Sequence, residues 1–196
     1  MKLLYRLLLL TAVSLSAACS SKDDDPQPTA PDPAVEATLV RSFTYPANSD
    51  YNNGHVYTQK SLTSMATLDA TELTLGFGAP EGKDDVSFTI PKTALAAGWQ
   101  GTYELRSTAA PQGPVKLWYF YTVSTTPSGT QGRIFSYPTQ GQLRITSYDA
   151  QRQLLSGSYQ LRVDDVADPT SGSLGGNGRR CNIEISGTFV NVKVKN

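Results

Sequence analysis

Apolar and polar residues alternate with a period of two along most of the chain from Ala37 onward, between clusters of glycine, proline, asparagine, aspartate and serine. This pattern is typical of half-buried antiparallel strands joined by short turns. The clearest alternating stretches are residues 73–77, 86–90, 103–105, 143–145 and 155–163. Roughly nine or ten such strands in one domain predict an all-β fold, an antiparallel β-sandwich, with a lipocalin-like β-barrel as the alternative. Residues 91–97 alone have a helix-favouring composition, so we expect at most one short helix.

Two junctions and one break in the alternation lead to further predictions. Asn53 and Gly54 form a dipeptide favoured in two-residue hairpin turns. Residues 148–152 form a short polar link between two alternating stretches and predict a second hairpin. Near the C-terminus, the apolar residues change parity after Phe189. Because a shift of one residue sends every side chain to the opposite face, we expect a β-bulge or a break at residues 189–191.

The start of the chain differs in character from the rest. Basic residues precede the short apolar stretch 7–15, which is followed by the small residues 16–18. This is the layout of a secretory signal peptide, and the stretch is shorter than the roughly 20 apolar residues of a membrane-spanning helix. Cys19 follows directly, and the segment resembles the bacterial lipobox. The resemblance implies a signal peptide at residues 1–18 and attachment of a lipid to the thiol of Cys19.

Residues 19–36 are expected to form a disordered tether rich in proline and aspartate, because they contain almost no apolar surface to bury. Their acidic cluster at 22–25 resembles the export signal of surface-exposed Bacteroidota lipoproteins. We therefore expect a protein attached to the outer membrane through its lipid and exposed at the cell surface. Loss of Lys2 and Arg6 with the signal peptide changes 17 basic and 17 acidic residues to 15 and 17, a net charge of −2. Such a chain lacks the positive excess that binding to nucleic acid requires.

Residue types suited to nucleophilic catalysis are scarce, since the chain has one histidine and two cysteines. His55 lies in a polar region, where an exposed side chain is the simplest interpretation. Cys181 alternates in phase with Ile183 and Ile185, which predicts a buried structural thiol rather than a nucleophile, because a reactive thiolate needs an accessible, positive setting. The sequence suggests no catalytic set and no cofactor.

The aspartates occur in adjacent pairs, at 84–85 and 164–165, with Asp168 close to the second pair. Neighbouring residues on a strand point to opposite faces, so these pairs alone do not provide the opposed carboxyl groups of a glycosidase. Asp164, Asp165 and Asp168 lie beside the glycine-rich segment 171–178 and are weak candidates for a calcium site. A solvated hairpin loop is the simpler interpretation.

The stretch 115–123 is unusually rich in aromatic residues, with Trp118 and Phe120 on one face of a predicted strand and Tyr119 and Tyr121 on the other. The simpler interpretation is a central strand that is buried on both faces. In the alternative interpretation, Trp118 with Phe120, or Tyr119 with Tyr121, forms an exposed platform on which sugar rings stack. Trp99 is a second possible ligand contact.

The block 141–159, followed by residues 183–189, resembles a Bacteroidota lipoprotein domain family of unknown function, in which an "ITxYD…SGxY" hairpin is paired with a closing "ISGTF" strand. The resemblance covers mainly residues 85–190 and implies fold and location only. We expect residues 37–196 to form a single β domain. The tether, the sandwich pattern and the lack of a catalytic set favour a domain that binds an unknown glycan or protein ligand. The alternatives are a carboxylate-dependent hydrolase acting on envelope or dietary glycans and a structural component of the envelope.

Overall fold

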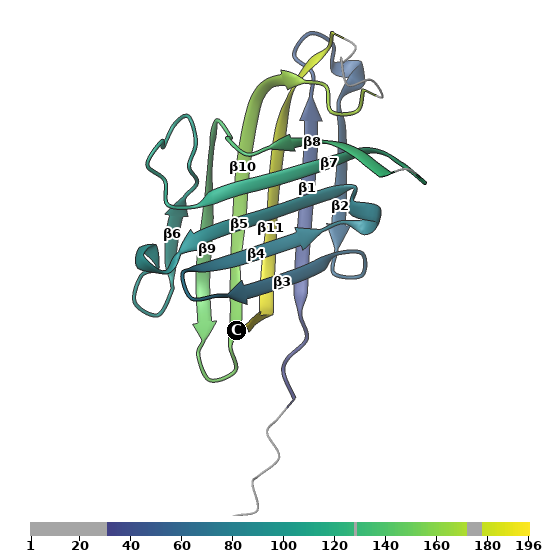
Figure 1. Cartoon of the computed structure of the whole chain (residues 1–196). Coiled ribbons are helices and arrows are strands. Elements are labelled where there is room, and N and C mark those ends of the chain that lie inside the picture. Colours follow the sequence, from purple (N-terminus) through teal and green to yellow (C-terminus); the bar gives the residue numbers. More distant parts are fainter. Residues whose placement is uncertain (1–30, 128, 172–177) are drawn as a thin grey trace, which may run out of the picture. The chain divides into compact units, whose positions relative to one another are not determined.

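A computed structural model describes residues 31–127, 129–171 and 178–196, and Pro33–Asn196 form one compact unit within it (Figure 1). The strands are β1 (Glu36–Thr44), β2 (Asn53–Thr58), β3 (Thr63–Leu68), β4 (Glu72–Gly78), β5 (Asp84–Pro91), β6 (Gly101–Glu104), β7 (Lys116–Thr126), β8 (Gly129–Phe135), β9 (Gln140–Asp149), β10 (Leu154–Ala167) and β11 (Arg180–Lys195). Three short 3-10 turns, η1 (Ser49–Tyr51), η2 (Pro80–Gly82) and η3 (Lys92–Ala94), are the only helical segments of the described residues. The last of these turns lies where a short helix was expected.

The eleven strands form one hydrogen-bonded sheet that folds over into two layers. The back layer contains β6, β9, β10, β11, β1 and β2, and the front layer contains β3, β4, β5, β7 and β8. In Figure 1 the strands of the front layer run across those of the back layer. Neighbouring strands pair antiparallel, except that the end of β11 pairs parallel with β3. The sheet does not close into a barrel, so the predicted β-sandwich is confirmed, with slightly more strands than expected.

The core lies between the two layers and is built from the inward positions of the alternating strands. Its largest fully buried side chains are Tyr119, Phe43, Phe77, Phe88, Phe189, Leu39, Leu73, Leu75, Ile90, Leu105, Leu143 and Ile145. Rings from both layers meet in it, and the Phe77 ring centroid lies 4.9 Å from that of Tyr159 and 5.3 Å from that of Phe189. Removal of this apolar surface from water is the main force holding the layers together.

The predicted irregularity near the C-terminus is confirmed as a β-bulge in β11. Phe189 pairs with Gly157 and Val192 pairs with Leu155, so β11 has one residue more than β10 over this interval. Asn191 takes up the extra residue with a φ of 57°. The bulge returns Val192 and Val194 to the core side, and it lets the end of β11 join the front layer.

One of the two predicted hairpin turns is confirmed and the other is wrong. The β9–β10 connection is a tight turn in which Asp149 Oδ1 accepts hydrogen bonds from the backbone N–H groups of Gln151 and Arg152. Asn53 and Gly54, by contrast, lie within β2. The chain reverses earlier, where the Asn52 side chain accepts a hydrogen bond from the Tyr45 N–H at 2.7 Å. That side-chain cap fixes a wider turn than the dipeptide would form by itself.

Candidate functional site

The aromatic residues of β7 divide between the core and the surface. Tyr119 and Tyr121 point between the layers and are 0% and 5% exposed, whereas Trp118, on the outer face, is 41% exposed. Phe120 shares the outer face with Trp118 and is half-buried. The expectation that this strand is buried on both faces is therefore wrong, because β7 belongs to an outer layer of a two-layer sandwich. The alternative with Trp118 and Phe120 outward describes the structure.

Trp118 and Phe120 form a short aromatic strip along the outer face of the front layer. Their ring centroids are 5.5 Å apart and their planes differ by 11°, which is an offset parallel arrangement. Phe120 leans over Gly132 of β8, where a Cβ atom would overlap its ring. The absence of a side chain at residue 132 thus leaves the space that the Phe120 ring occupies.

Polar residues of β5 flank this strip on one side, and the exposed Ile134 of β8 lies opposite Phe120 on the other. On β5, Ser87 lies directly opposite Trp118 and Asp85 directly opposite Phe120. Burial, followed by the charge of neighbouring Asp84, raises the pKa of the Asp85 carboxyl. Beyond Ser87 the row continues through Gly76 of β4 to Met65 of β3, and the exposed Met65 side chain lies over Gly76. The strip therefore combines ring faces with adjacent hydrogen-bonding groups.

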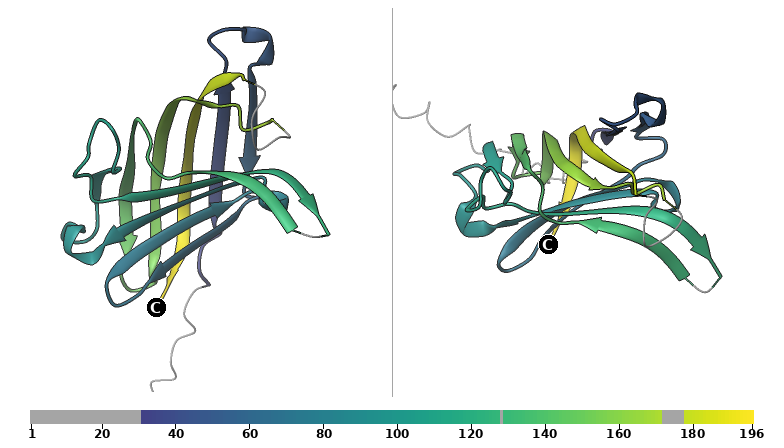
Figure 2. Two further views of the ribbon diagram at one scale, coloured as in Figure 1. Left: turned by 45° about the horizontal axis from the view of Figure 1, so that its top comes forward. Right: turned by 90° about the horizontal axis from the view of Figure 1, so that it is seen from above.

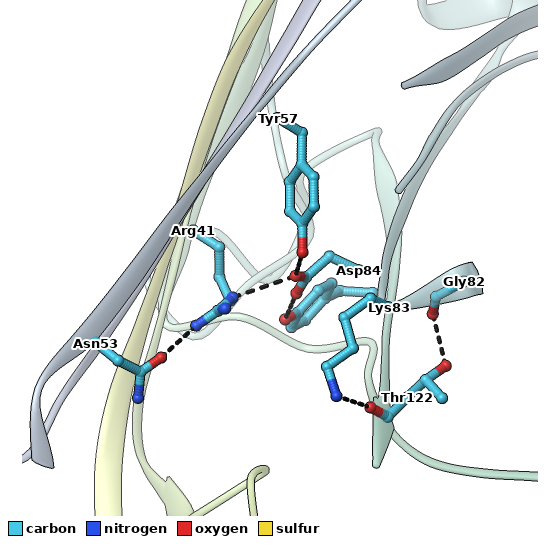
Figure 3. Close-up of polar contacts among 8 residues, drawn as sticks. Arg41, Asn53, Tyr57, Gly82, Lys83, Asp84 and Thr122 are labelled. Atoms are coloured by element: carbon cyan, nitrogen blue, oxygen red, sulfur yellow. Dashed lines mark hydrogen bonds and ion pairs between the residues drawn. The ribbon is translucent and has the colours of Figure 1, made fainter. Parts of the chain in front are cut away.

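Behind the strip, a buried polar cluster fixes β5 and β7 to the back layer (Figure 3). Asp84, at the start of β5, is 0% exposed. Its Oδ1 accepts a hydrogen bond from the Tyr119 hydroxyl at 2.6 Å, and its Oδ2 accepts one from the Tyr57 hydroxyl at 2.7 Å. Arg41 Nε of β1 lies 3.2 Å from the same Oδ2, and Arg41 Nη1 donates to Asn53 Oδ1 at 2.6 Å. One carboxylate thus connects strands β1 and β2 of the back layer with β5 and β7 of the front layer.

Most side chains of this Asp84 cluster are buried, so they hold the strands in position rather than line the surface. The guanidinium of Arg41 also lies over the Phe43 ring, at 4.2 Å from its centroid, and is largely buried. Buried charges persist when they are paired and hydrogen-bonded, and here each oxygen of Asp84 has a donor. Because Asp84 and Asp85 are adjacent, fixing Asp84 inward sets Asp85 outward beside the aromatic strip.

Four buried tyrosines give the domain a measurable response to alkaline pH. Burial, assisted by the hydrogen bond to Asp168, raises the pKa of Tyr45 to about 12. Burial also raises the pKa of Tyr57, Tyr119 and Tyr159 above the usual value near 10. A raised pKa means that the folded state favours the protonated hydroxyl, so the stabilisation is complete below about pH 10 and is lost as the pH rises above it.

We therefore expect these four tyrosines to ionise late and together with unfolding. The measurement is a pH titration of tyrosinate absorbance, followed in parallel with the circular dichroism of the sheet. Ionisation of all tyrosines near pH 10 with the sheet intact would contradict the expectation.

Trp99, the second candidate contact, lies apart from the strip. Its ring stacks on Tyr148 of β9 with a centroid separation of 3.8 Å and an interplanar angle of 10°. Both rings are partly buried and pack against the core. Trp99 therefore covers an end of the core in contact with the back layer, and the structure does not bring it together with Trp118.

The three aspartates considered for calcium bind separate arginines. Asp164 Oδ1 lies 2.6 Å from Arg162 Nε, Asp168 Oδ2 lies 2.7 Å from Arg179 Nη2, and Asp165 pairs with Arg180. In the described part of the chain, no group of three or more carboxylate, histidine or cysteine side chains is placed to hold a metal ion. The described structure therefore does not bring these three aspartates together as a metal site, because each is paired with the guanidinium group of a separate arginine. The neighbouring residues 172–177 of the glycine-rich segment lie outside the described residues.

The remaining candidates behave as the sequence predicts. His55 is exposed on β2, with its ring centroid 4.2 Å from that of Tyr57. Cys181 is 0% exposed, and burial raises the pKa of its thiol to about 11. A thiol with this pKa is protonated near neutral pH and is a poor nucleophile. Neither residue forms part of a catalytic arrangement in the described structure.

The expected signal peptide and the lipidation site Cys19 lie outside the described residues, as does most of the tether. Among the residues that are described, the structure contains no helix with the length and apolar character needed to cross a bilayer. The first strand begins at Glu36, close to the expected end of the tether.

Comparison with known proteins gives no relative. No protein-family model matches the chain, and neither the curated proteins nor the solved structures provide a match. The resemblance of residues 85–190 to Bacteroidota lipoprotein domains stays a prediction.

Proposed function

We propose that the chain is a lipid-anchored protein of the outer membrane, exposed at the cell surface, whose β-sandwich is a binding module for glycans. The proposed location is supported by the sequence before the domain: a signal-peptide layout, Cys19 in a lipobox-like setting and an acidic, proline-rich tether. Membership of a Bacteroidota lipoprotein family belongs to the same proposal. A protein ligand is the competing class of partner.

The single observation that carries the binding proposal is the exposure of the Trp118 and Phe120 strip on the outer face of the front layer. A large aromatic side chain that is 41% exposed leaves apolar surface in water unless a ligand covers it. A sugar ring has an apolar face and a rim of hydroxyl groups. The aromatic rings of the strip can stack on the apolar face of the sugar. Ser87 and Asp85 beside the strip can form hydrogen bonds with the hydroxyl groups of the sugar.

The positions of the carboxylates give less support to the hydrolase alternative. Glu104 and Glu184 are two carboxylates that line one surface hollow, but β6 and β11 are separated by β9 and β10. Three strand spacings place their backbones on the order of 14 Å apart, so only side chains that lean toward each other would bring the carboxyl groups to the roughly 6.5–9.5 Å of inverting glycosidases. Glu184 Oε1 is also occupied by Arg162 Nη1 at 2.9 Å. A binding module therefore accounts for the surface better than a hydrolase does.

Substitution of Trp118 by alanine tests the proposal. A glycan array of the mature chain identifies the ligand, and titration of that ligand then measures the affinity. We expect Trp118→Ala to weaken binding by about tenfold, the size of effect that loss of one stacked ring gives, and Trp118→Phe to retain most of the affinity. Val56→Ala removes an apolar side chain that is 61% exposed on the back layer and serves as the control with unchanged affinity.

Two results would overturn the proposal that the aromatic strip binds glycans. One is the absence of any glycan ligand on the array while a pull-down identifies a protein whose binding depends on Trp118. The other is a glycan ligand that binds Trp118→Ala and the unsubstituted chain equally well.

A further inference from the structure

The outer face of the back layer contains two adjoining hollows, far from the aromatic strip in the sheet order. One has a volume of about 530 Å³ and the other about 320 Å³. They share Val40, Gln142, Gln160 and Ser186, and they lie over strands β6, β9, β10, β11 and β1. Together they form a groove, which we call the back groove.

The back groove is lined mainly by amide and hydroxyl side chains in register across neighbouring strands. Gln142 of β9 lies opposite Gln160 of β10, which in turn lies opposite Ser186 of β11. The residues that follow them, such as Leu143 and Leu161, are buried in the core, so the polar side chains project outward. A row of amides and hydroxyls offers both hydrogen-bond donors and acceptors.

The charged side chains that line the back groove balance in number, with Arg144 and Arg162 against Glu104 and Glu184. Arg162 Nε lies 2.6 Å from Asp164 Oδ1, and Arg162 Nη1 lies 2.9 Å from Glu184 Oε1. A strongly anionic or cationic ligand therefore meets no net excess of opposite charge in the groove. An apolar ligand would remove the amides from water without replacing their hydrogen bonds, which is unfavourable.

From this chemistry we propose that the back groove binds a segment of a neutral oligosaccharide. Each hydroxyl group of such a ligand can both donate and accept hydrogen bonds, which matches the side-chain amides of Gln142 and Gln160 and the hydroxyl of Ser186. This site lies on the opposite layer from the aromatic strip and does not depend on it. With both sites, one domain holds two segments of polysaccharide, and simultaneous attachment raises the apparent affinity for a polymer well above that for either segment.

The test is a nuclear magnetic resonance titration of the ¹⁵N-labelled mature chain, with Cys19→Ser to keep it free of lipid. The probes are neutral hexasaccharides of glucose, xylose and mannose, with hexagalacturonate as the anionic comparison. The side-chain amide signals of Gln142 and Gln160 report on the back groove, and the indole N–H signal of Trp118 reports on the strip. We expect at least one neutral hexasaccharide to shift the two glutamine signals in a saturable manner.

Substitution then separates the back groove from the strip. Gln160→Ala is expected to weaken the binding that is read from the Gln142 amide by about tenfold, as for loss of hydrogen bonds in a desolvated contact. Gln151→Ala is the matched control, because Gln151 lies exposed in the β9–β10 turn and outside the groove. The affinity of the Gln151→Ala variant for the hexasaccharide should be unchanged.

Several outcomes would overturn the proposal for the back groove. Glutamine signals that move with none of the neutral probes would do so, as would shifts with hexagalacturonate alone. Shifts that depend on protein concentration without a sugar would instead assign this face to contact with a second copy of the chain. The Trp118 signal is judged separately, so loss of the back-groove site and failure of the proposed binding function give different results.

Discussion

Replacing Asp84 by asparagine is expected to lower the free energy of unfolding by about 3–5 kcal/mol, the cost of leaving one partner of a buried ion pair uncompensated. The Arg41 side chain is 8% exposed and Asp84 is 0% exposed, so water cannot replace the missing charge. The amide nitrogen of an asparagine would also face a donor where Asp84 now accepts hydrogen bonds from Tyr57, Tyr119 and Arg41. The whole free energy of unfolding of a protein is only about 5–15 kcal/mol, so this loss is large.

Urea unfolding of the mature chain, followed by tryptophan fluorescence, measures the effect. Asp85→Asn is the matched control, since Asp85 is the adjacent aspartate and faces outward; its free energy of unfolding should stay within about 1 kcal/mol of the original. The double variant Arg41→Met with Asp84→Asn should lose less free energy of unfolding than the sum of the losses in the two single variants, because no unpaired charge remains. Equal losses for Asp84→Asn and Asp85→Asn would contradict the assigned role of the cluster.

This cluster also connects stability with the candidate site. Tyr119 is held by Asp84 on the inner face of β7, while Trp118 and Phe120 lie on the outer face of the same strand. A strand whose inner side chains have fixed hydrogen bonds keeps its register, and register decides which side chains face outward. The aromatic strip therefore depends on the buried carboxylate without touching it.

Much of the fold is predictable from the sequence because the alternation of apolar and polar residues indicates which side chains face inward. The change of parity after Phe189 predicts the bulge that the structure shows at Asn191. The same pattern contains a signal for the buried cluster, since Arg41 occupies an inward position between Leu39 and Phe43. A charged residue at an inward position requires a partner, although the sequence alone does not say which one.

What the sequence could not decide depended on contacts between residues that are distant along the chain. Arg41 and Asp84 come from different layers, and only the folding of β5 against β1 and β2 brings them together. The exposure of Trp118 depends on the number of sheet layers in the domain, because a third layer would be needed to cover the outer face of β7. The sequence of the strand itself does not give that number. The error at Asn53 has a similar origin, because the Asn52 side chain and the pairing of β2 with β1 outweigh the preference of the local dipeptide.

Lipid attachment at Cys19 has the other large expected effect, on location rather than stability. We expect Cys19→Ala to abolish labelling of the chain with a palmitate analogue and to move it from the membrane fraction to the soluble fraction. Each buried CH₂ group of an acyl chain contributes about 0.8 kcal/mol to membrane binding, and stable anchoring takes two chains or an equivalent second signal.

The chain contains its own control for this experiment. Cys181 is buried, and burial raises the pKa of its thiol to about 11, so Cys181→Ala should leave both labelling and membrane attachment unchanged. Labelling that persists in Cys19→Ala but disappears in Cys181→Ala would reject the anchor at Cys19. Retention of Cys19→Ala in the membrane fraction without label would instead show that the β domain holds a membrane partner by itself. Protease treatment of intact cells then tests the outward orientation, because a surface-exposed tether at residues 19–36 is open to cleavage whereas one facing the periplasm is protected.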